Sequence, residues 1–264
     1  MVSLVSSERE HGYDTTRAHI DHQLFAILLN TMGILNQSRD EELNGIDFDF
    51  EGIQSIEEWN AYLTFLSFAS TYLHHENLIV SVAVHPGQFL PAEVCQNLDR
   101  VHVMTYDMIP SPQRNSDSMT NNHHASLHSS KAAIDKFIKY GCHPSKLLLG
   151  IPAYGRHEKN VGLVQSYSEI VDDVLKEYGD NDDEIKRTIR KLRYWNGYLF
   201  DSPEDIREKV KYAMRMGLGG VFFWELGQDK QLGGSAEGGG ILLEEAAATA
   251  SGIYIGNDAP KEEL

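Results

Sequence analysis

One stretch of the chain alternates apolar with acidic residues: Leu43-Asn44-Gly45-Ile46-Asp47-Phe48-Asp49-Phe50-Glu51-Gly52. A period of two is typical of a β-strand, so Asp47, Asp49 and Glu51 are predicted to share one face and the apolar residues the other. The two Phe side chains indicate that the apolar face is covered, which turns the carboxyl groups toward the protein interior. Three acids one strand step apart repel one another, and burial raises the pKa of at least one of them.

This strand fits acid catalysis. A protonated carboxylic acid beside an ionised one is the arrangement that general acid catalysis at a glycosidic bond requires. A divalent-metal site and an ordinary acidic strand at the surface are the alternatives that the strand alone leaves open.

Length and charge limit the function classes. The 264 residues, 41% of them hydrophobic, are enough for one sizeable core and match the usual length of an α/β barrel. The formal net charge of −16 argues against nucleic acid as a partner, because phosphate binding needs a basic surface, whereas a neutral polysaccharide tolerates an acidic one. No apolar run reaches membrane-spanning length, and no signal peptide is recognised after Met1. We therefore expect no membrane partner.

The cysteines and the C-terminal tail bear on localisation. Cys95 and Cys142 lie outside the motifs described below and are expected to be buried thiols, with a disulfide between them the less favoured alternative. The last four residues, Lys261-Glu262-Glu263-Leu264, differ by one conservative change from an endoplasmic-reticulum retention signal, although an acidic tail ending in Leu could arise by chance.

Strand-like and helix-like segments alternate along most of the chain. Besides the acidic strand, strands are expected at 2–5, 77–84, 101–106, 147–151, 198–200 and 219–224. Helices are expected at 17–40, 56–73, 130–140, 168–178, 183–193, 203–216 and 246–250. Such alternation implies a parallel sheet with right-handed crossovers. We expect one domain over residues 1–245, with a short insertion at about 158–200, followed by a tail at 246–264.

Five stretches resemble glycoside hydrolase family 18, the chitinase family, and occur in the family's order between about residues 40 and 230. The acidic strand is similar to D-G-x-D-x-D-x-E, with Asn44 in place of the first Asp. The others are Met104-Thr105-Tyr106-Asp107, similar to M-x-Y-D; His124-Ala125-Ser126, similar to a recurrent connection; Gly150-Ile151-Pro152-Ala153-Tyr154-Gly155-Arg156, similar to G-x-P-x-Y-G-R; and the closing strand Gly220–Trp224.

The resemblance implies an α/β fold of the (β/α)8 TIM-barrel type, with the site at the C-terminal ends of the strands. About six of the eight parallel strands are expected here. Ser3-Leu4-Val5-Ser6 falls where the family's third strand carries S-x-G-G, with both glycines replaced. The first two strand–helix units are therefore expected to be absent, from an incomplete barrel or a truncated gene product, and the exposed sheet edges would make the chain poorly soluble.

The resemblance also implies a retaining mechanism in which the acetamido oxygen of the substrate is the nucleophile. Glu51 would protonate the leaving oxygen and later activate water. Asp49 would orient the acetamido N–H and stabilise the oxazolinium cation, and Asp47 would tune Asp49. Tyr106 would donate a hydrogen bond to the acetamido carbonyl oxygen. The replacement at Asn44 is expected to tune this chemistry rather than to abolish it.

Five further residues would bind substrate. Asp107 would contact the sugar, Trp224 would stack beneath its apolar face, and Tyr154 and Arg156 would line or brace the site, together with Met104. The alternatives are a place in the core for Trp224 and a structural ion pair for Arg156. No cofactor or metal is implied, and a monomer acting on chitin or N-acetylglucosamine oligosaccharides in the secretory pathway or outside the cell is expected.

Three questions stay open at this point. His74-His75 and His123-His124 invite a metal reading, but adjacent residues on one element point apart, so solvated or loop histidines are favoured. A non-catalytic, lectin-like glycan-binding protein or an inactive fragment remains the alternative to an enzyme. The sequence does not choose among chitin, chito-oligosaccharides and glycoprotein N-glycan cores.

Overall fold

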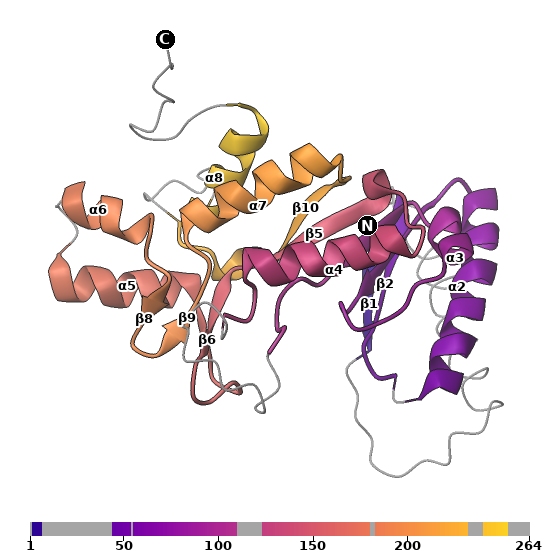
Figure 1. Cartoon of the computed structure of the whole chain (residues 1–264), viewed down its shortest axis with the longest axis horizontal. Coiled ribbons are helices and arrows are strands. Elements are labelled where there is room, and N and C mark those ends of the chain that lie inside the picture. Colours follow the sequence, from indigo (N-terminus) through magenta and orange to yellow (C-terminus); the bar gives the residue numbers. More distant parts are fainter. Residues whose placement is uncertain are drawn as a thin grey trace, which may run out of the picture. The chain divides into compact units, whose positions relative to one another are not determined.

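The computed structural model describes residues 2–6, 44–53, 55–109, 123–179, 183–231 and 240–252 (Figure 1). Its strands are β1 (Val2–Ser6), β2 (Gly45–Phe50), β3 (Ile79–Val84), β4 (Arg100–Val103), β5 (Leu147–Pro152), β6 (Tyr154–His157), β7 (Val164–Ser166), β8 (Tyr194–Trp195), β9 (Tyr198–Leu199) and β10 (Gly220–Trp224). Its α-helices are α2 (Ile56–His75), α3 (Ala92–Asn97), α4 (Leu127–Lys139), α5 (Tyr167–Tyr178), α6 (Asp183–Ile189), α7 (Pro203–Met216) and α8 (Ile241–Ala250).

The chain divides into two compact units, which are described separately below. Unit 1 comprises residues 1–103 and 135–147, and unit 2 comprises residues 104–134 and 148–264. None of the described helices is both long and apolar enough to cross a bilayer.

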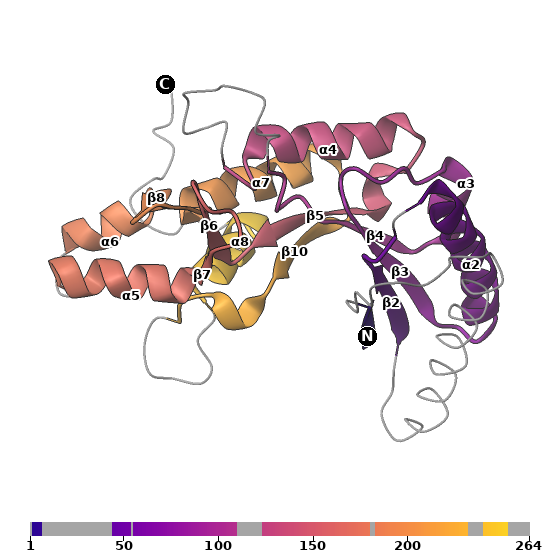
Figure 2. The same ribbon diagram turned by 90° about the horizontal axis from the view of Figure 1, so that it is seen from below.

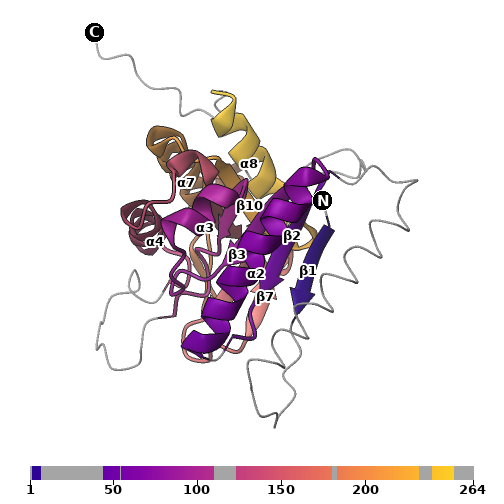
Figure 3. The same cartoon turned by 90° about the vertical axis from the view of Figure 1, so that its right-hand side faces the viewer.

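Unit 1 contains four parallel strands in the order β1-β2-β3-β4. The acidic stretch is strand β2, and helix α2 lies across β2 and β3 (Figure 3). Phe48 of β2 packs edge-on against Phe65 of α2 with ring centroids 5.3 Å apart, and Phe50 lies 5.4 Å from Tyr62. The apolar face of the strand is therefore covered by a helix, as the alternation predicted.

Helix α2 begins and packs as its sequence dictates. Ser55 is the N-cap of a capping box, in which its hydroxyl accepts from Glu58 N–H while the Glu58 carboxylate accepts from Ser55 N–H. Leu63, Leu66 and Leu73, spaced by three and seven residues, are buried. The helix thus covers the apolar face of β2.

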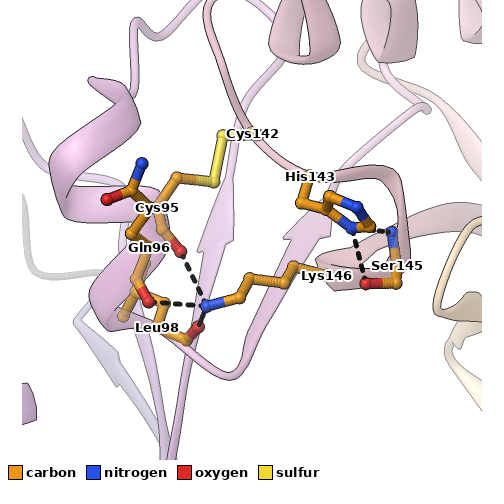
Figure 4. Close-up of a disulfide and its surroundings, with 7 residues drawn as sticks. All are labelled: Cys95, Gln96, Leu98, Cys142, His143, Ser145 and Lys146. Atoms are coloured by element: carbon orange, nitrogen blue, oxygen red, sulfur yellow. Dashed lines mark hydrogen bonds between the residues drawn. A yellow bond between two sulfur atoms is a disulfide. The ribbon is translucent and has the colours of Figure 1, made fainter.

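A disulfide corrects the expectation of two thiols. Cys95, on α3, is bonded to Cys142, just after α4 (Figure 4). Their Cα atoms are 5.4 Å apart, a separation that a disulfide spans and that sequence spacing does not reveal. Next to it, the Lys146 ammonium donates to the carbonyl oxygens of Gln96 and Leu98, both at 2.6 Å, at the C-terminal end of α3.

Unit 2 is built from a parallel pair and a small antiparallel sheet. Strands β5 and β10 run parallel, with Gly220 opposite Leu148 and Trp224 opposite Pro152. Strands β6 to β9 form a four-stranded antiparallel sheet in the order β7-β6-β9-β8. Helices α5 and α6 lie side by side in this region (Figure 2). Capping boxes at Ser166 and Ser202 begin α5 and α7.

The parallel strands, four in unit 1 and two in unit 2, agree with the predicted α/β pattern, whereas β6, β7 and β8 were not predicted. Helix α6 ends at Ile189 instead of Arg193, because Lys191 N–H and Leu192 N–H bond three residues back and turn the chain. Helix α8 begins at Ile241, five residues before the expected start. Helix α3, six residues long, was not predicted. The helix expected at 17–40 and the tail residues 253–264 lie outside the described residues.

Candidate active site

The acids of β2 lie on its inward face in unit 1. Asp47 and Asp49 are 9% and 6% exposed, whereas Glu51, directly after the strand, is exposed. Gly45 at the start of the strand passes so close to its neighbour that an added Cβ would lie 2.2 Å from the Ile79 carbonyl oxygen. The strand therefore buries two carboxyl groups and presents the third to solvent.

Asp49 carries the raised pKa that the alternating pattern predicted. Burial is the main cause, the negative charges of Glu51 and Asp47 add to it, and His102 opposes it, so that the pKa of Asp49 rises to about 6. Among the described residues, the Asp49 Oδ1 atom is buried without a hydrogen-bond partner. Asp49 is thus half protonated near pH 6, next to two other carboxyl groups.

Asp47 is held by one side chain from the neighbouring strand β3 and one from β4, the strand beyond it. Ser81 Oγ of β3 donates to Asp47 Oδ1 at 2.5 Å, and His102 Nδ1 of β4 lies 2.8 Å from the same oxygen. Sequence reasoning did not single out Ser81 or His102. The available signal was one polar residue in each of two otherwise apolar strand segments that follow the acidic strand in the chain, Ile-Val-Ser-Val-Ala-Val and Val-His-Val.

Asp107 is the centre of a polar cluster in unit 2. The Arg156 guanidinium holds it with two nitrogens, with Nη2 2.5 Å from Asp107 Oδ2, and the Tyr154 hydroxyl donates to Oδ1 at 2.9 Å. Burial by itself would raise the pKa of Asp107, but the contact with His124, hydrogen bonds from Arg156 and Tyr154 and the Arg156 charge lower it well below its usual range. Asp107 is therefore an ionised acceptor with its side chain 32% exposed.

The strand β6 explains why two of these partners reach one carboxylate. Tyr154 and Arg156 are two residues apart and so share a face. Between them, Gly155 faces the other way, where a Cβ would lie 3.1 to 3.3 Å from Ile170, Leu199 and Phe200. Arg156 forms an ion pair with Asp107, as the alternative of an ion-paired Arg156 predicted. Its partner Asp107 is itself a predicted site residue.

The histidines of the 123–124 pair are loop residues, as one of the two favoured alternatives predicted, but they are not solvated. They lie in a turn-containing loop, yet His123 and His124 are only 9% and 2% exposed rather than solvated. Their rings stack in parallel, with centroids 5.5 Å apart, instead of pointing apart, because the turn begins at His124 and the pair is not on a regular strand. His124 Nδ1 accepts from Asp107 N–H at 3.3 Å and lies 3.2 Å from Asp107 Oδ1, and desolvation lowers the pKa of His124.

The remaining predicted residues of unit 2 differ in burial. Tyr106 is buried and packs edge-on against Tyr154 and Phe222, with centroids 6.3 and 6.1 Å away. Met104 is buried as well, whereas Trp224, the last residue of β10, is 44% exposed and so is not a core residue. Within the described ranges, no group of three or more His, Cys, Asp or Glu residues could hold a metal ion.

The predicted residues thus form two groups. Asp47, Asp49 and Glu51 share one strand end in unit 1. Tyr106, Asp107, Tyr154 and Arg156 contact one another in unit 2, which also contains Met104 and Trp224.

Comparison with known proteins decides the family. The model of glycosyl hydrolases family 18 matches residues 15–229. This chain belongs to glycosyl hydrolases family 18. Membership accounts for the order of the five motifs, all of which lie within or at the ends of the matched segment.

The relatives carry chitinase names. The chain is 26% identical to Endochitinase 1 of Metarhizium robertsii over 240 residues, which are 73% of this chain and 54% of that protein. It is 29% identical to Nod factor hydrolase protein 1 of Medicago truncatula over 231 residues, 70% of this chain and 58% of that protein. The chain therefore spans about half the length of these curated relatives.

Solved chitinase and chitinase-like structures share the fold. The chitinase ChiB of Flavobacterium johnsoniae matches with a TM-score of 0.66 and 20% identity, over 95% of this chain and 74% of that one. The chitinase-like agglutinin of Robinia pseudoacacia matches with a TM-score of 0.58 and 25% identity, over 82% of this chain and 70% of that one. The fold class is α/β of the TIM-barrel type, with six of its parallel strands among the described residues.

Proposed function

We propose that this protein hydrolyses β-1,4-linked N-acetylglucosamine in chitin or chito-oligosaccharides, with retention of configuration. The observation that carries the proposal is the acid strand β2, on which Asp49, with its pKa raised to about 6, lies between Asp47 and Glu51. A strand that keeps a proton beside an ionised carboxylate supports general acid catalysis at mildly acidic pH.

The three acids on and directly after β2 are assigned different roles according to their positions. Glu51 is exposed at the strand end, where it can reach a glycosidic oxygen, so it is assigned the proton donor and, after departure of the leaving group, the base that activates water. Asp49 orients the acetamido N–H and stabilises the positive charge of the oxazolinium ion. Asp47, held by Ser81 and His102, keeps negative charge next to Asp49.

The second group binds the N-acetylated sugar. Tyr106 is assigned the hydrogen bond to the acetamido carbonyl oxygen, and Asp107, fixed by Arg156 and Tyr154, accepts from a sugar hydroxyl. Trp224, 44% exposed, offers a flat apolar face on which a pyranose ring can stack. Met104 supports this group from the buried side. These assignments follow the motif resemblance residue by residue.

Family 18 enzymes are exceptions to the scheme in which an enzyme carboxylate attacks the anomeric carbon. In the proposed reaction the acetamido oxygen attacks the anomeric carbon as the bond to the leaving oxygen breaks, and Glu51 supplies the proton to that oxygen. Water then opens the oxazolinium ring and returns a proton to Glu51. The N-acetyl group is therefore part of the chemistry and not only a recognition element.

Glycan binding without hydrolysis is the second candidate. The agglutinin among the similar structures favours it, since that protein is described as chitinase-like. Retention of Glu51 at the acidic end of the motif is what favours hydrolysis here, because a binding protein has no need of a proton donor at that position.

The Cys95–Cys142 disulfide supports a place for the protein in the secretory pathway or outside the cell. Disulfides persist in oxidising compartments and are reduced in the cytosol. The tail at 261–264, read as a retention signal, lies outside the described residues and adds nothing to this proposal.

The test is the change Glu51→Gln, assayed on a fluorogenic chitobioside with the full chain. Loss of the proton donor should lower kcat by about 10²- to 10⁴-fold, while chito-oligosaccharide binding persists, because the amide keeps the size of the side chain. Glu57→Gln, on the exposed first turn of α2, is the matched control and should keep full activity.

Two outcomes would contradict the proposal. Undiminished turnover by Glu51→Gln would remove Glu51 from the reaction, and a wild-type protein that binds chitotriose without cleaving it would be a lectin. The same assay on fully deacetylated glucosamine oligomers should show no turnover, and efficient cleavage of them would exclude the acetamido nucleophile.

A further inference from the structure

The strand face that carries the acids also carries a histidine with no assigned role. In the register of unit 1, Asp47 of β2 is opposite Ser81 of β3, and Asp49 is opposite Ala83. Ala83 is in turn opposite His102 of β4. His102 thus lies in the same row as Asp49, separated from it only by the smallest chiral side chain.

Because the Ala83 side chain is small, the His102 imidazole can extend over it toward Asp47 of β2. His102 Nδ1 lies 2.8 Å from Asp47 Oδ1, and Ser81 Oγ donates to the same oxygen at 2.5 Å. The side chains of Asp47 and His102 are each 13% exposed, so this contact is shielded from bulk water. Nδ1 can donate a hydrogen to the carboxylate both in the neutral Nδ1–H tautomer and in the imidazolium ion.

Two donors on one carboxylate oxygen favour the ionised form of that carboxyl group. An ionised Asp47 one strand step from Asp49 makes a second charge on the strand unfavourable. Asp49, whose Oδ1 has no partner among the described residues, is then the group that takes up the proton. The raised pKa of Asp49, with Asp47 among its causes, agrees with this order of charges.

We propose that His102 is a positioning residue. Together with Ser81 it holds Asp47 as a fixed, ionised acceptor, so that the proton taken up by the Asp47–Asp49 pair lies on Asp49. Among the described residues of unit 1, Arg100 of β4 is on the same strand face as His102 but is exposed. Helix α2 contributes Tyr62, whose pKa burial and the charges of Asp47 and Asp49 raise further, so it stays neutral. Strand β3 contributes only Ser81, and β1 contains no titratable residue. Glu51 is the remaining acid of the strand.

The test compares two amide replacements of similar polarity. In His102→Asn the amide nitrogen occupies roughly the place of Nδ1, so the bond to Asp47 can form again. In His102→Gln the amide nitrogen occupies the place of Nε2 and the bond is lost. With 13C-labelled Asp carboxyl groups, the full-length wild type should show a carboxyl titration near pH 6. His102→Asn should keep it within about 0.3 pH units, and His102→Gln should move it upward by about one unit.

The direction of the shift follows from the charges. In His102→Gln, Asp47 loses a hydrogen-bond donor and binds a proton more tightly, so the coupled titration of the pair moves to higher pH. The imidazole charge is absent from both variants and does not contribute to the difference between them. Equal titration in His102→Gln and the wild type would overturn the proposal, as would equal shifts in the Asn and Gln variants. A purely structural His102 would change stability in both variants without this difference.

A kinetic experiment, which rests on the proposed function, can fail independently of the NMR titration. If the chain hydrolyses a chitobioside, the alkaline fall of kcat/KM should move upward in His102→Gln by the same amount as the carboxyl titration and stay in place in His102→Asn. A wild type without hydrolytic activity would refute the proposed function, while the NMR titration would still decide the role of His102.

Discussion

At the scale of single residues, the buried Asp49 and the half-buried Asp107 are stabilised in opposite protonation states. Asp107 is surrounded by donors and stays ionised, whereas Asp49 has an unpaired buried oxygen and two acidic neighbours. An ionised Asp49 is therefore costly to the fold. The ionisation of Asp49 lowers the free energy of unfolding, and the site retains this residue because its proton takes part in the proposed function.

Asp49→Asn should stabilise the protein in a pH-dependent way. Since the folded pKa of about 6 lies above the unfolded value, the folded state binds this proton more tightly, and the wild type loses stability as pH rises from about 4 to about 6. The advantage of the variant in unfolding free energy should grow by about 2–3 kcal/mol between pH 4 and pH 8. Denaturant unfolding at both pH values measures it.

Asp173→Asn, on α5, is the surface control for this change. A constant difference between Asp49→Asn and the wild type across the pH range would show that Asp49 ionises as easily in the folded chain as in the unfolded one.

At the scale of elements, the Cys95–Cys142 disulfide links the short helix α3 to the segment that follows α4 (Figure 4). Helix α3 is only six residues long and has no side-chain N-cap, so its own hydrogen bonds contribute little stability. The cross-link and the Lys146 ammonium on its terminal carbonyl groups hold α3 against the rest of unit 1.

Breaking the disulfide should therefore destabilise the protein. For a separation of 47 residues, the chain-entropy estimate of the loss is about 4 kcal/mol, so Cys95→Ser/Cys142→Ser should unfold at a clearly lower guanidinium concentration. Reductant should shift the wild type in the same direction and leave the double variant unchanged. Matching midpoints for oxidised wild type and double variant would show that the bond constrains nothing in the unfolded chain.

At the scale of the whole molecule, the net charge of −16 has to be compatible with the proposed substrate. Chitin and its N-acetylated oligomers are neutral, so long-range electrostatics neither steers nor repels them. A cationic, deacetylated polymer would in contrast be attracted by the acidic surface without specificity.

Hydrolysis of a neutral chito-oligosaccharide should accordingly be almost independent of salt. Between about 20 and about 500 mM NaCl, kcat/KM should change by less than about two-fold, because screening acts only on charged partners. Retention of the protein on glycol chitosan should weaken over the same range and serves as the control. A steep fall of kcat/KM with salt on the neutral substrate would indicate that charge takes part in substrate capture.

The local order of strands and helices could be predicted because periodicity is a property of neighbouring residues. The alternation in β2, the apolar run of β3 and the Pro at the start of α7 all identified their elements, and the alternation also predicted which face α2 covers. Short elements such as α3 escaped, since six residues contain too few turns for a helical period to be recognised.

What the sequence by itself determined is the family, the three acids and their shared face, and through repulsion and burial the raised pKa of one of them. Only the tertiary structure decided which acid that is, Asp49, because burial and neighbours depend on the strands alongside. Only it joined Cys95 to Cys142, stacked His123 on His124 and brought His102 to Asp47. These contacts depend on strand register, on a turn and on the packing of α3 beside the end of α4, and none of the three is encoded in the spacing along the chain.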